Sequence, residues 1–322
     1  MNNGIGRLMD SEDWYARKVV AENPNTPAEA LVILANDKDH NVREAVAENP
    51  STPVETLNIL AKDKDWLVRR AVAGNTSASD NALEKLATDM FWGVRCVVAG
   101  NPSAPGKVLD RLAGDDDWNV CWAVARNPNT SAETLTKLAM DKYGYIRQAV
   151  AENPSAPGEV LDRLATDEDS DVREGVAENP SAPAETLIKL AEDREWLVRR
   201  AVARNTNTPG DALENLATDE YWNVRGAMAG NPNAPAEALD TLAKYGDTNI
   251  RCAVAGNPNA TENILLMVSR DHSPSVREAV ARNPKIPPEA AINLSTSKIL
   301  RIRRALSENP AVPEHIRVGL IL

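Results

Sequence analysis

The chain has 322 residues and a formal net charge of −11, and only 4% of its residues are aromatic. The acidic balance argues against non-specific nucleic-acid binding, because such binding relies on lysines and arginines that neutralise phosphates. Nothing approaches the ~20 consecutive apolar residues of a membrane-spanning helix. Met1–Asp13 also lacks an apolar run of signal-peptide length. We therefore expect a cytoplasmic protein with no membrane contact.

One short motif, V-R-E-A-V-A-E-N-P at Val42–Pro50, recurs through the chain. A fixed short period predicts one elongated repeat domain over residues 1–322, in which each unit contacts mainly its neighbours. This period overrides the two globular domains that the length alone suggests. The motif's asparagine occurs twelve times, 26 residues apart, and proline follows ten of the copies: Asn23, Asn49, Asn75, Asn101, Asn127, Asn153, Asn179, Asn205, Asn231, Asn257, Asn283 and Asn309.

The first helix of each unit, helix A, is illustrated by the unit Asn49–Gly74. Pro50 ends the preceding helix, because proline cannot continue one. Thr52 is a candidate N-cap, with Pro53 at the first helical position and Glu55 completing a capping box. Where alanine replaces this threonine, the cap can shift to the preceding Ser or Asn. We expect helix A to run for about ten residues, with an apolar stripe at Leu57, Leu60 and Ala61.

The second helix, helix B, follows a polar turn. Asp65 is its expected N-cap, and the next Asn-Thr or Asn-Pro ends it. Helices this short are marginal alone in water, so both must bury their apolar faces against each other and against adjoining units. The apolar face of helix B is formed by Val68, Ala71, Val72 and Ala73.

The two ends of the chain fit the same register. We expect residues 1–13 to form a degenerate half-repeat and residues 310–322 to form a terminal one, in which Ile316 and Leu320 occupy core positions of helix A. Gly319–Leu322 would then be an uncapped apolar edge, and a solenoid usually needs a polar cap. Either the natural protein continues or this edge meets a partner, and oligomerisation through it is one such contact.

These residues carry a family resemblance. The chain resembles the leucine-rich repeat variant family of bacteria, in twelve in-register copies, through the spacing of Leu57, Leu60, Asp63, Val68, Arg69, Val72 and Asn75. The resemblance implies an all-α, right-handed superhelical solenoid of about twelve two-helix repeats without a sheet, in which α- and 3₁₀-helices alternate. It leaves open which helix is 3₁₀ and which lines the concave side. It implies no enzyme activity.

Two features qualify the resemblance. Some members of the family carry an N-terminal cysteine cluster for an iron–sulfur centre, but no cysteine precedes Cys96 here. That cofactor is therefore not expected. The separation of Asp63 from Val68 and Arg69 is also similar to that in HEAT repeats.

Catalytic and metal-binding motifs have little support in the sequence. The three histidines are far apart in the array, and no Gly-rich phosphate loop is present. The three cysteines, Cys96, Cys121 and Cys252, lie in different units without CxxC spacing, which indicates neither a metal site nor a disulfide framework. We therefore predict neither an enzyme nor a cofactor.

Three repeated polar positions invite two interpretations. Arg43 recurs in every unit except where Cys121 replaces it, and Asp37 recurs in most. The arginines could form a basic ladder for an anionic polymer, or they could pair with the aspartates of stacked units. We favour pairing, because the arginine does not vary as a ligand-reading position would. On that view Cys121 leaves Asp115 short of a partner. We also expect the asparagines to be structural, satisfying helix carbonyls or ending the helix in left-handed geometry.

Residues that vary from unit to unit mark the candidate binding face. The positions of residues 40, 44 and 48 lie four apart on one face of helix B, and all seven tryptophans fall on them. Residues 40–76 and 170–206 match at 26 of 37 positions, which indicates a duplication of five repeats. Alternatively, each tryptophan packs over the Asp-containing turn of the neighbouring unit. The predicted partner-binding residues are Trp66, Arg70, Trp92, Trp118, Trp122, Arg126, Trp196, Arg200, Arg204 and Trp222.

These observations predict a non-catalytic repeat scaffold that binds a protein or peptide through the helix-B face, since Trp and Arg are common interface anchors. One alternative is a HEAT-like nucleic-acid binder that uses the same Trp and Arg stripe, although the net charge of −11 disfavours it. A second alternative is a structural spacer or a self-assembling rod, joined through the apolar C-terminal edge.

Overall fold

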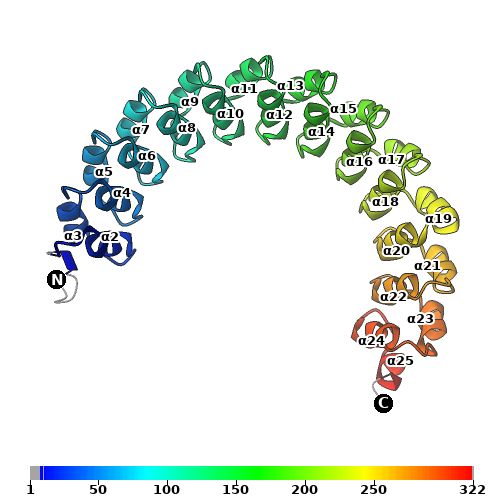
Figure 1. The fold of residues 1–322 in the computed structure, drawn as a ribbon. Coiled ribbons are helices and arrows are strands. Elements are labelled where there is room, and N and C mark those ends of the chain that lie inside the picture. Colours follow the sequence, from blue (N-terminus) through cyan, green and yellow to red (C-terminus); the bar gives the residue numbers. More distant parts are fainter. Residues whose placement is uncertain (1–7, 10, 321–322) are drawn as a thin grey trace. The chain divides into compact units, whose positions relative to one another are not determined.

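The computed structural model describes residues 8, 9 and 11–320 (Figure 1). This part of the chain contains 24 helices and no strand, so the predicted all-α solenoid is confirmed. None of these helices is long and apolar enough to cross a membrane. The half-repeat predicted at residues 1–13 lies mostly outside the described residues, as do residues 321 and 322 of the predicted apolar edge.

The chain divides into two compact units, Met1–Val160 and Leu161–Leu322. The helices A of the first unit are α3 (Ala28–Leu34), α5 (Val54–Leu60), α7 (Asp80–Leu86), α9 (Gly106–Leu112) and α11 (Ala132–Leu138). Its helices B are α2 (Trp14–Glu22), α4 (His40–Glu48), α6 (Trp66–Gly74), α8 (Trp92–Gly100), α10 (Trp118–Arg126) and α12 (Gly144–Glu152). Helix α13 (Gly158–Leu164) spans the division between the units.

The second unit repeats the same alternation. Its helices B are α14 (Ser170–Glu178), α16 (Trp196–Arg204), α18 (Trp222–Gly230), α20 (Thr248–Gly256), α22 (Pro274–Arg282) and α24 (Leu300–Glu308). Its helices A are α15 (Ala184–Leu190), α17 (Gly210–Leu216), α19 (Ala236–Tyr245), α21 (Glu262–Val268), α23 (Pro288–Ser295) and α25 (Glu314–Gly319). That the array is one continuous domain stays a prediction.

Both helices of the repeat are α-helical throughout the described residues, so the implied alternation with 3₁₀-helices is not found. Helix A is shorter than predicted, at seven residues in α5. Leu57 and Leu60 of this helix are buried, as are Val68 and Val72 of α6, and the two helices are in contact. Within each unit the helices B follow one side and the helices A the other (Figure 1). Successive helices B pack together far more extensively than successive helices A.

The capping pattern corrects one prediction and confirms another. Thr52 does not cap helix A, because α5 begins at Val54 and Pro53 occupies the N-cap position without a side-chain hydrogen bond. The buried Thr52 hydroxyl instead donates to the carbonyl of Val46, 2.6 Å away in the preceding helix. Asp65 caps helix B as predicted, accepting the backbone N–H of Leu67 at 2.9 Å.

The repeated asparagine joins each unit to the one before it. The Asn101 Nδ2 donates to the carbonyl of Ala73 at 2.6 Å and to that of Asn75 at 3.2 Å. Its Oδ1 accepts the backbone N–H of Ser103 at 2.7 Å. The structural role is confirmed, but the left-handed helix end is wrong: Asn101 has φ −71° and ψ 124°. A side chain from the next unit satisfies the helix carbonyl, so a left-handed turn is not needed for that purpose.

The repeated arginine forms the predicted pairs with aspartate. Arg43 Nε and Nη2 donate to Asp63 Oδ2 at 2.6 Å and Oδ1 at 3.0 Å, while Nη1 donates to the carbonyl of Asp37 at 2.8 Å. The Arg43 and Asp63 side chains are only 8% and 9% exposed. These arginines hold their own turn and the next unit's turn together, and they are not a ladder for an anionic polymer. The same ion pair recurs at Arg17–Asp37, Arg69–Asp89, Arg95–Asp115, Arg173–Asp193, Arg199–Asp219 and Arg251–Asp271.

The pairing corrects the prediction for Cys121. In each of these pairs the arginine reaches the aspartate 20 residues ahead, so Asp115 pairs with Arg95 at 2.6 Å. Asp141 stands 20 residues after Cys121, so it lacks the arginine that pairs with this aspartate in other units. Cys121 occupies the position of the repeated arginine, and its thiol lies 3.3 Å from the carbonyl oxygen of Asp115. Burial raises the pKa of this thiol to about 11, so it stays protonated at neutral pH.

The substitution Cys121→Arg should therefore stabilise α10 and α12. The new guanidinium can reach the carbonyl of Asp115 and the carboxylate of Asp141, and hydrogen bonds to a charged group contribute about 2 kcal/mol. Amide hydrogen exchange in these two helices measures the gain. Cys96→Arg adds the same charge outside the ladder and should give no such protection. Faster amide exchange in Cys121→Arg than in the wild type would contradict the inference that Asp141 lacks an arginine partner.

Candidate partner-binding surface

The predicted binding residues lie on the solvent-facing side of the helices B. Trp92 and Trp222 are 50% and 54% exposed, and Trp66 and Trp118 are also exposed. Trp122 and Trp196 are half-buried. The guanidinium-bearing side chains Arg70, Arg126 and Arg204 are exposed, and Arg200 is half-buried.

Two of the tryptophans also pack against the next repeat. The Trp66 ring stacks on Phe91 with centroids 5.7 Å apart, and Trp196 stacks on Tyr221 at 5.8 Å. Phe91 and Tyr221 stand in the turns that precede α8 and α18. The packing alternative therefore holds for these two rings, and the binding role of the surface that they leave exposed stays a prediction.

Phe91 and Tyr221 were missed by the sequence reasoning, although a signal for them exists. Both occupy the N-cap position at which Asp65 and Asp117 cap their own helices. Neither aromatic side chain makes a capping hydrogen bond. An Asp cap contributes about 1 kcal/mol, so an aromatic residue in its place indicates another role. Here that role is to extend the aromatic surface.

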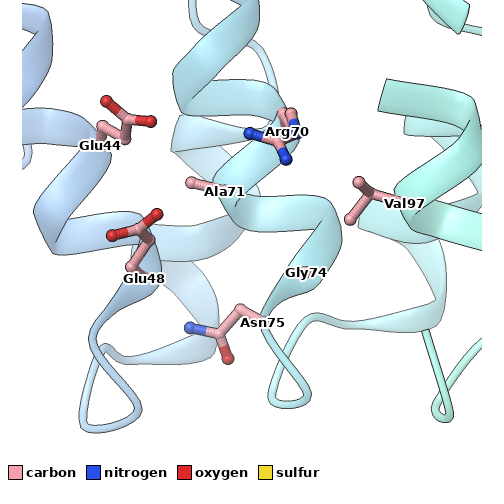
Figure 2. Close-up of a pocket in the computed structure, with 7 residues that line it drawn as sticks. All are labelled: Glu44, Glu48, Arg70, Ala71, Gly74, Asn75 and Val97. Atoms are coloured by element: carbon pink, nitrogen blue, oxygen red, sulfur yellow. The ribbon is translucent and has the colours of Figure 1, made fainter. Parts of the chain in front are cut away.

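In the first unit, Trp66, Arg70 and Trp92 are brought together around an apolar recess of about 500 Å³. Its other lining residues are Phe91, Gly93, Cys96 and Val97. Arg70 also lines a neighbouring recess of about 260 Å³, which contains Glu44 and Glu48. Figure 2 shows the two glutamates on one helix, Arg70 and Gly74 on the next, and Val97 on the third. Burial and the Glu48 carboxylate raise the pKa of Glu44.

A separate cluster follows in the same unit. Trp118 packs edge-on against Tyr145 with centroids 4.7 Å apart. The Arg126 guanidinium lies 4.9 Å from the centre of the Trp122 ring. It is also 3.9 Å from a carboxylate oxygen of Glu152. The cation in this cluster is therefore already engaged by an aromatic ring and by a carboxylate.

In the second unit, a recess of about 530 Å³ is lined by Arg200, Arg204 and Trp222, with Gly226 and Gly230 among its other lining residues. The Arg200 guanidinium lies 5.2 Å from the centre of the Trp196 ring. The predicted residues of this unit therefore form one continuous patch.

The chemistry of these recesses suits binding. They combine aromatic faces with guanidinium groups, and such side chains anchor interfaces. Among the described residues, no three His, Cys, Asp or Glu side chains come together as metal ligands would.

Similarity to known proteins agrees with the repeat geometry. A family model described as leucine rich repeat variant matches residues 40–65 and 196–220. A second model, described as a leucine rich repeat variant domain, matches residues 121–179. No curated protein matches the chain significantly.

Among solved structures, the chain is similar to a leucine-rich repeat variant with a novel repetitive structural motif. The two share 26% identity and a TM-score of 0.51, over 69% of this chain and 88% of that one. An engineered protein matches at 20% identity and a TM-score of 0.38, over 100% of this chain and 99% of that one. A mutant of Kap121p matches at 12% identity and a TM-score of 0.48, over 98% of this chain and 50% of that one. The chain is thus a tandem array of helical repeats that resemble those of leucine-rich repeat variant proteins, and the family models match it over residues 40–65, 121–179 and 196–220.

Proposed function

We propose that the chain is a non-catalytic scaffold that binds a protein or peptide partner through the solvent-facing side of its helices B. The supporting observation is that Trp92 and Trp222 each expose about half of their surface at the rim of a recess. A tryptophan left this exposed gives up much of the burial energy of its large apolar surface, and a partner that covers the ring would recover it. The repeated Arg, Asp and Asn residues are engaged in structural bonds, which leaves the variable stripe as the candidate for recognition.

A nucleic-acid partner is less well supported. Stacking of bases on tryptophan with phosphates on arginine would suit the same residues. However, Glu44 and Glu48 line the recess next to Arg70, and Glu174 lies 3.6 Å from Arg200. A nucleic acid carries a charge at every nucleotide, so these carboxylates and the net charge of −11 would repel a phosphate backbone that ran along the stripe.

The double variant Trp92→Ala and Trp222→Ala should lose partner binding. The two rings make no ring-to-ring contact with described aromatic residues, so their removal should leave the fold intact. An anchor tryptophan contributes about 2 kcal/mol or more, which is roughly 30-fold in Kd. The measurement is affinity capture from the native host, followed by titration of the purified captured partner.

Ile59→Ala with Ile292→Ala is the matched control, because these isoleucines are 64% and 54% exposed on helices A. It should leave Kd unchanged. Equal binding by the tryptophan variant and the wild type would contradict the proposal. Retention of DNA or RNA that weakens steeply with salt would favour the nucleic-acid alternative.

A further inference from the structure

The recesses of the two units are related by the five-repeat duplication but differ in charge. Each aromatic residue and the arginine that line the apolar recess of the first unit have counterparts 130 residues later: Trp66 and Trp196, Arg70 and Arg200, Phe91 and Tyr221, Trp92 and Trp222. The last residue of the arginine-bearing helix is Gly74 in α6 and Arg204 in α16. The second recess therefore has one additional guanidinium.

Both units carry the same two glutamates beside the first arginine. Glu44 and Glu48 line a recess with Arg70, and their counterparts 130 residues later are Glu174 and Glu178, so the charge difference comes from Gly74 and Arg204. A methyl group at Gly74 would lie 3.5 Å from Val97, which is ordinary contact, so a side chain fits there.

The additional guanidinium of the second unit has no ion-pair partner among the described residues. No acidic residue lines this recess among those described. Arg200 Nη2 pairs with Glu174 at 3.6 Å, while Arg200 Nε is buried and makes no hydrogen bond with a described residue. Arg204 is exposed and makes no ion pair with any described residue. Two guanidinium groups therefore line one recess, and only that of Arg200 is paired with a described carboxylate.

Two glycines, Gly226 and Gly230, leave part of the wall of this recess without side chains. Gly226 lies in the middle of α18, where glycine is about 1 kcal/mol less favourable than alanine. A methyl group there would only touch Ile250 at 3.9 Å, and one at Gly230 would meet nothing within 4 Å. Internal packing does not require either glycine, so the open wall suits a ligand backbone that approaches closely.

We propose that the Arg200–Arg204–Trp222 recess selects an acidic peptide segment, whose carboxylates pair with the two guanidinium groups while a neighbouring apolar side chain covers Trp222. This inference rests on the proposed peptide-binding function and adds the ligand's charge. Charge complementarity carries it, because Arg binds carboxylates in bidentate geometry. Two or three extended residues span roughly 7–10 Å, which is enough to reach from a guanidinium to the tryptophan.

The test uses a random peptide library displayed on phage, selected on the full chain and on Arg204→Gly, which reproduces the glycine found at position 74. Peptides selected on the wild type should be enriched in Asp and Glu next to an apolar residue, and this enrichment should vanish on Arg204→Gly. The best peptide should lose about tenfold in affinity when its carboxylates become amides, and about tenfold with Arg204→Gly. Gly74→Arg in the Arg204→Gly background should restore binding.

Arg282→Gly is the matched control, because it removes the same charge and side chain from the corresponding end of α22. It should change the affinity less than about twofold, since Arg282 lies outside the recess and already pairs with Glu278 at 3.1 Å. Selected peptides that need Trp92 or Trp222 but carry no acid would overturn the charge inference and leave the proposed function standing. Failure to select any peptide would overturn both. Two other results would overturn the acidic peptide as the occupant of this recess. One is binding of oligothymidylate that depends on Arg204, and the other is self-association of the chain that Arg204→Gly abolishes.

Discussion

Replacing Asn101 with alanine is expected to weaken the contact between α6 and α8 by about 3 kcal/mol. The Asn101 side chain is 2% exposed, so water cannot take over its hydrogen bonds. The carbonyl of Ala73 and the N–H of Ser103 would lose the partners they have at 2.6 and 2.7 Å. The carbonyl of Asn75 keeps its hydrogen bond from the backbone N–H of Ala78 at 3.0 Å, so its loss of Asn101 adds little to the cost. Each stranded buried group costs about 1–3 kcal/mol.

The effect should be local, because each repeat depends mainly on its neighbours. Amide hydrogen exchange in α6 and α8 is therefore a better measurement than one global melting temperature. Asn101→Asp should be worse than alanine at neutral pH, because it places a carboxylate oxygen against the carbonyl of Ala73.

Asn129→Ala provides the control for this prediction. Asn129 also donates to a carbonyl of the preceding repeat, Pro102 at 2.6 Å, but it is exposed. Water can replace that bond, so its loss should cost less than about 1 kcal/mol. If Asn101→Ala and Asn129→Ala protected the backbone amides from hydrogen exchange equally well, the structural role assigned to the buried asparagine would be contradicted.

Features set by neighbours within one repeat could be predicted from the sequence. The cap at Asp65 needs only the N–H two residues ahead, and the outward stripe needs only helical spacing. Features set by stacking between repeats were less accessible. Arg43 has one aspartate six residues before it and another 20 residues after it, and the 26-residue period makes these positions equivalent. No pattern in one sequence tells which carboxylate the guanidinium reaches, and this is why Cys121 was assigned to Asp115 instead of Asp141.

The candidate site shows the same limit. The tryptophans and arginines were found because they share one face of one helix. Phe91 and Tyr221 belong to turns, and only stacking brings them beside Trp66 and Trp196. The difference in charge between the two units comes from Gly74 and Arg204, which the sequence shows, but only the packing shows that these residues line recesses.

The substitution Arg69→Ala is expected to cost about 3–5 kcal/mol locally, because it leaves a buried carboxylate without its partner. Arg69 Nη2 donates to Asp89 Oδ1 at 3.0 Å, and Nη1 donates to the carbonyl of Asp63 at 2.8 Å. The Asp89 side chain is only 6% exposed. Arg70→Ala removes the adjacent arginine from the same helix, but Arg70 is exposed and makes no ion pair with a described residue. Its cost should stay within about 0.5 kcal/mol, and exchange in α6 and α8 compares the two.

The difference between these variants should shrink in acid. Burial tends to raise the pKa of Asp89, but the hydrogen bonds from Arg69 and from the backbone N–H of Phe91 outweigh it and lower the pKa below its ordinary value. A lowered folded-state pKa contributes stability that is present above the unfolded value, about 4, and is lost as the pH falls through the folded value. In Arg69→Ala the carboxylate has no such stabilisation to lose, so its exchange rates should approach those of the wild type below about pH 3. Asp37, Asp63, Asp115, Asp193 and Asp271 have pKa values lowered in the same way. The wild-type array should therefore loosen throughout both units in the same pH window, and a cost of Arg69→Ala that did not depend on pH would show that the pair does not stabilise the stack through its charge.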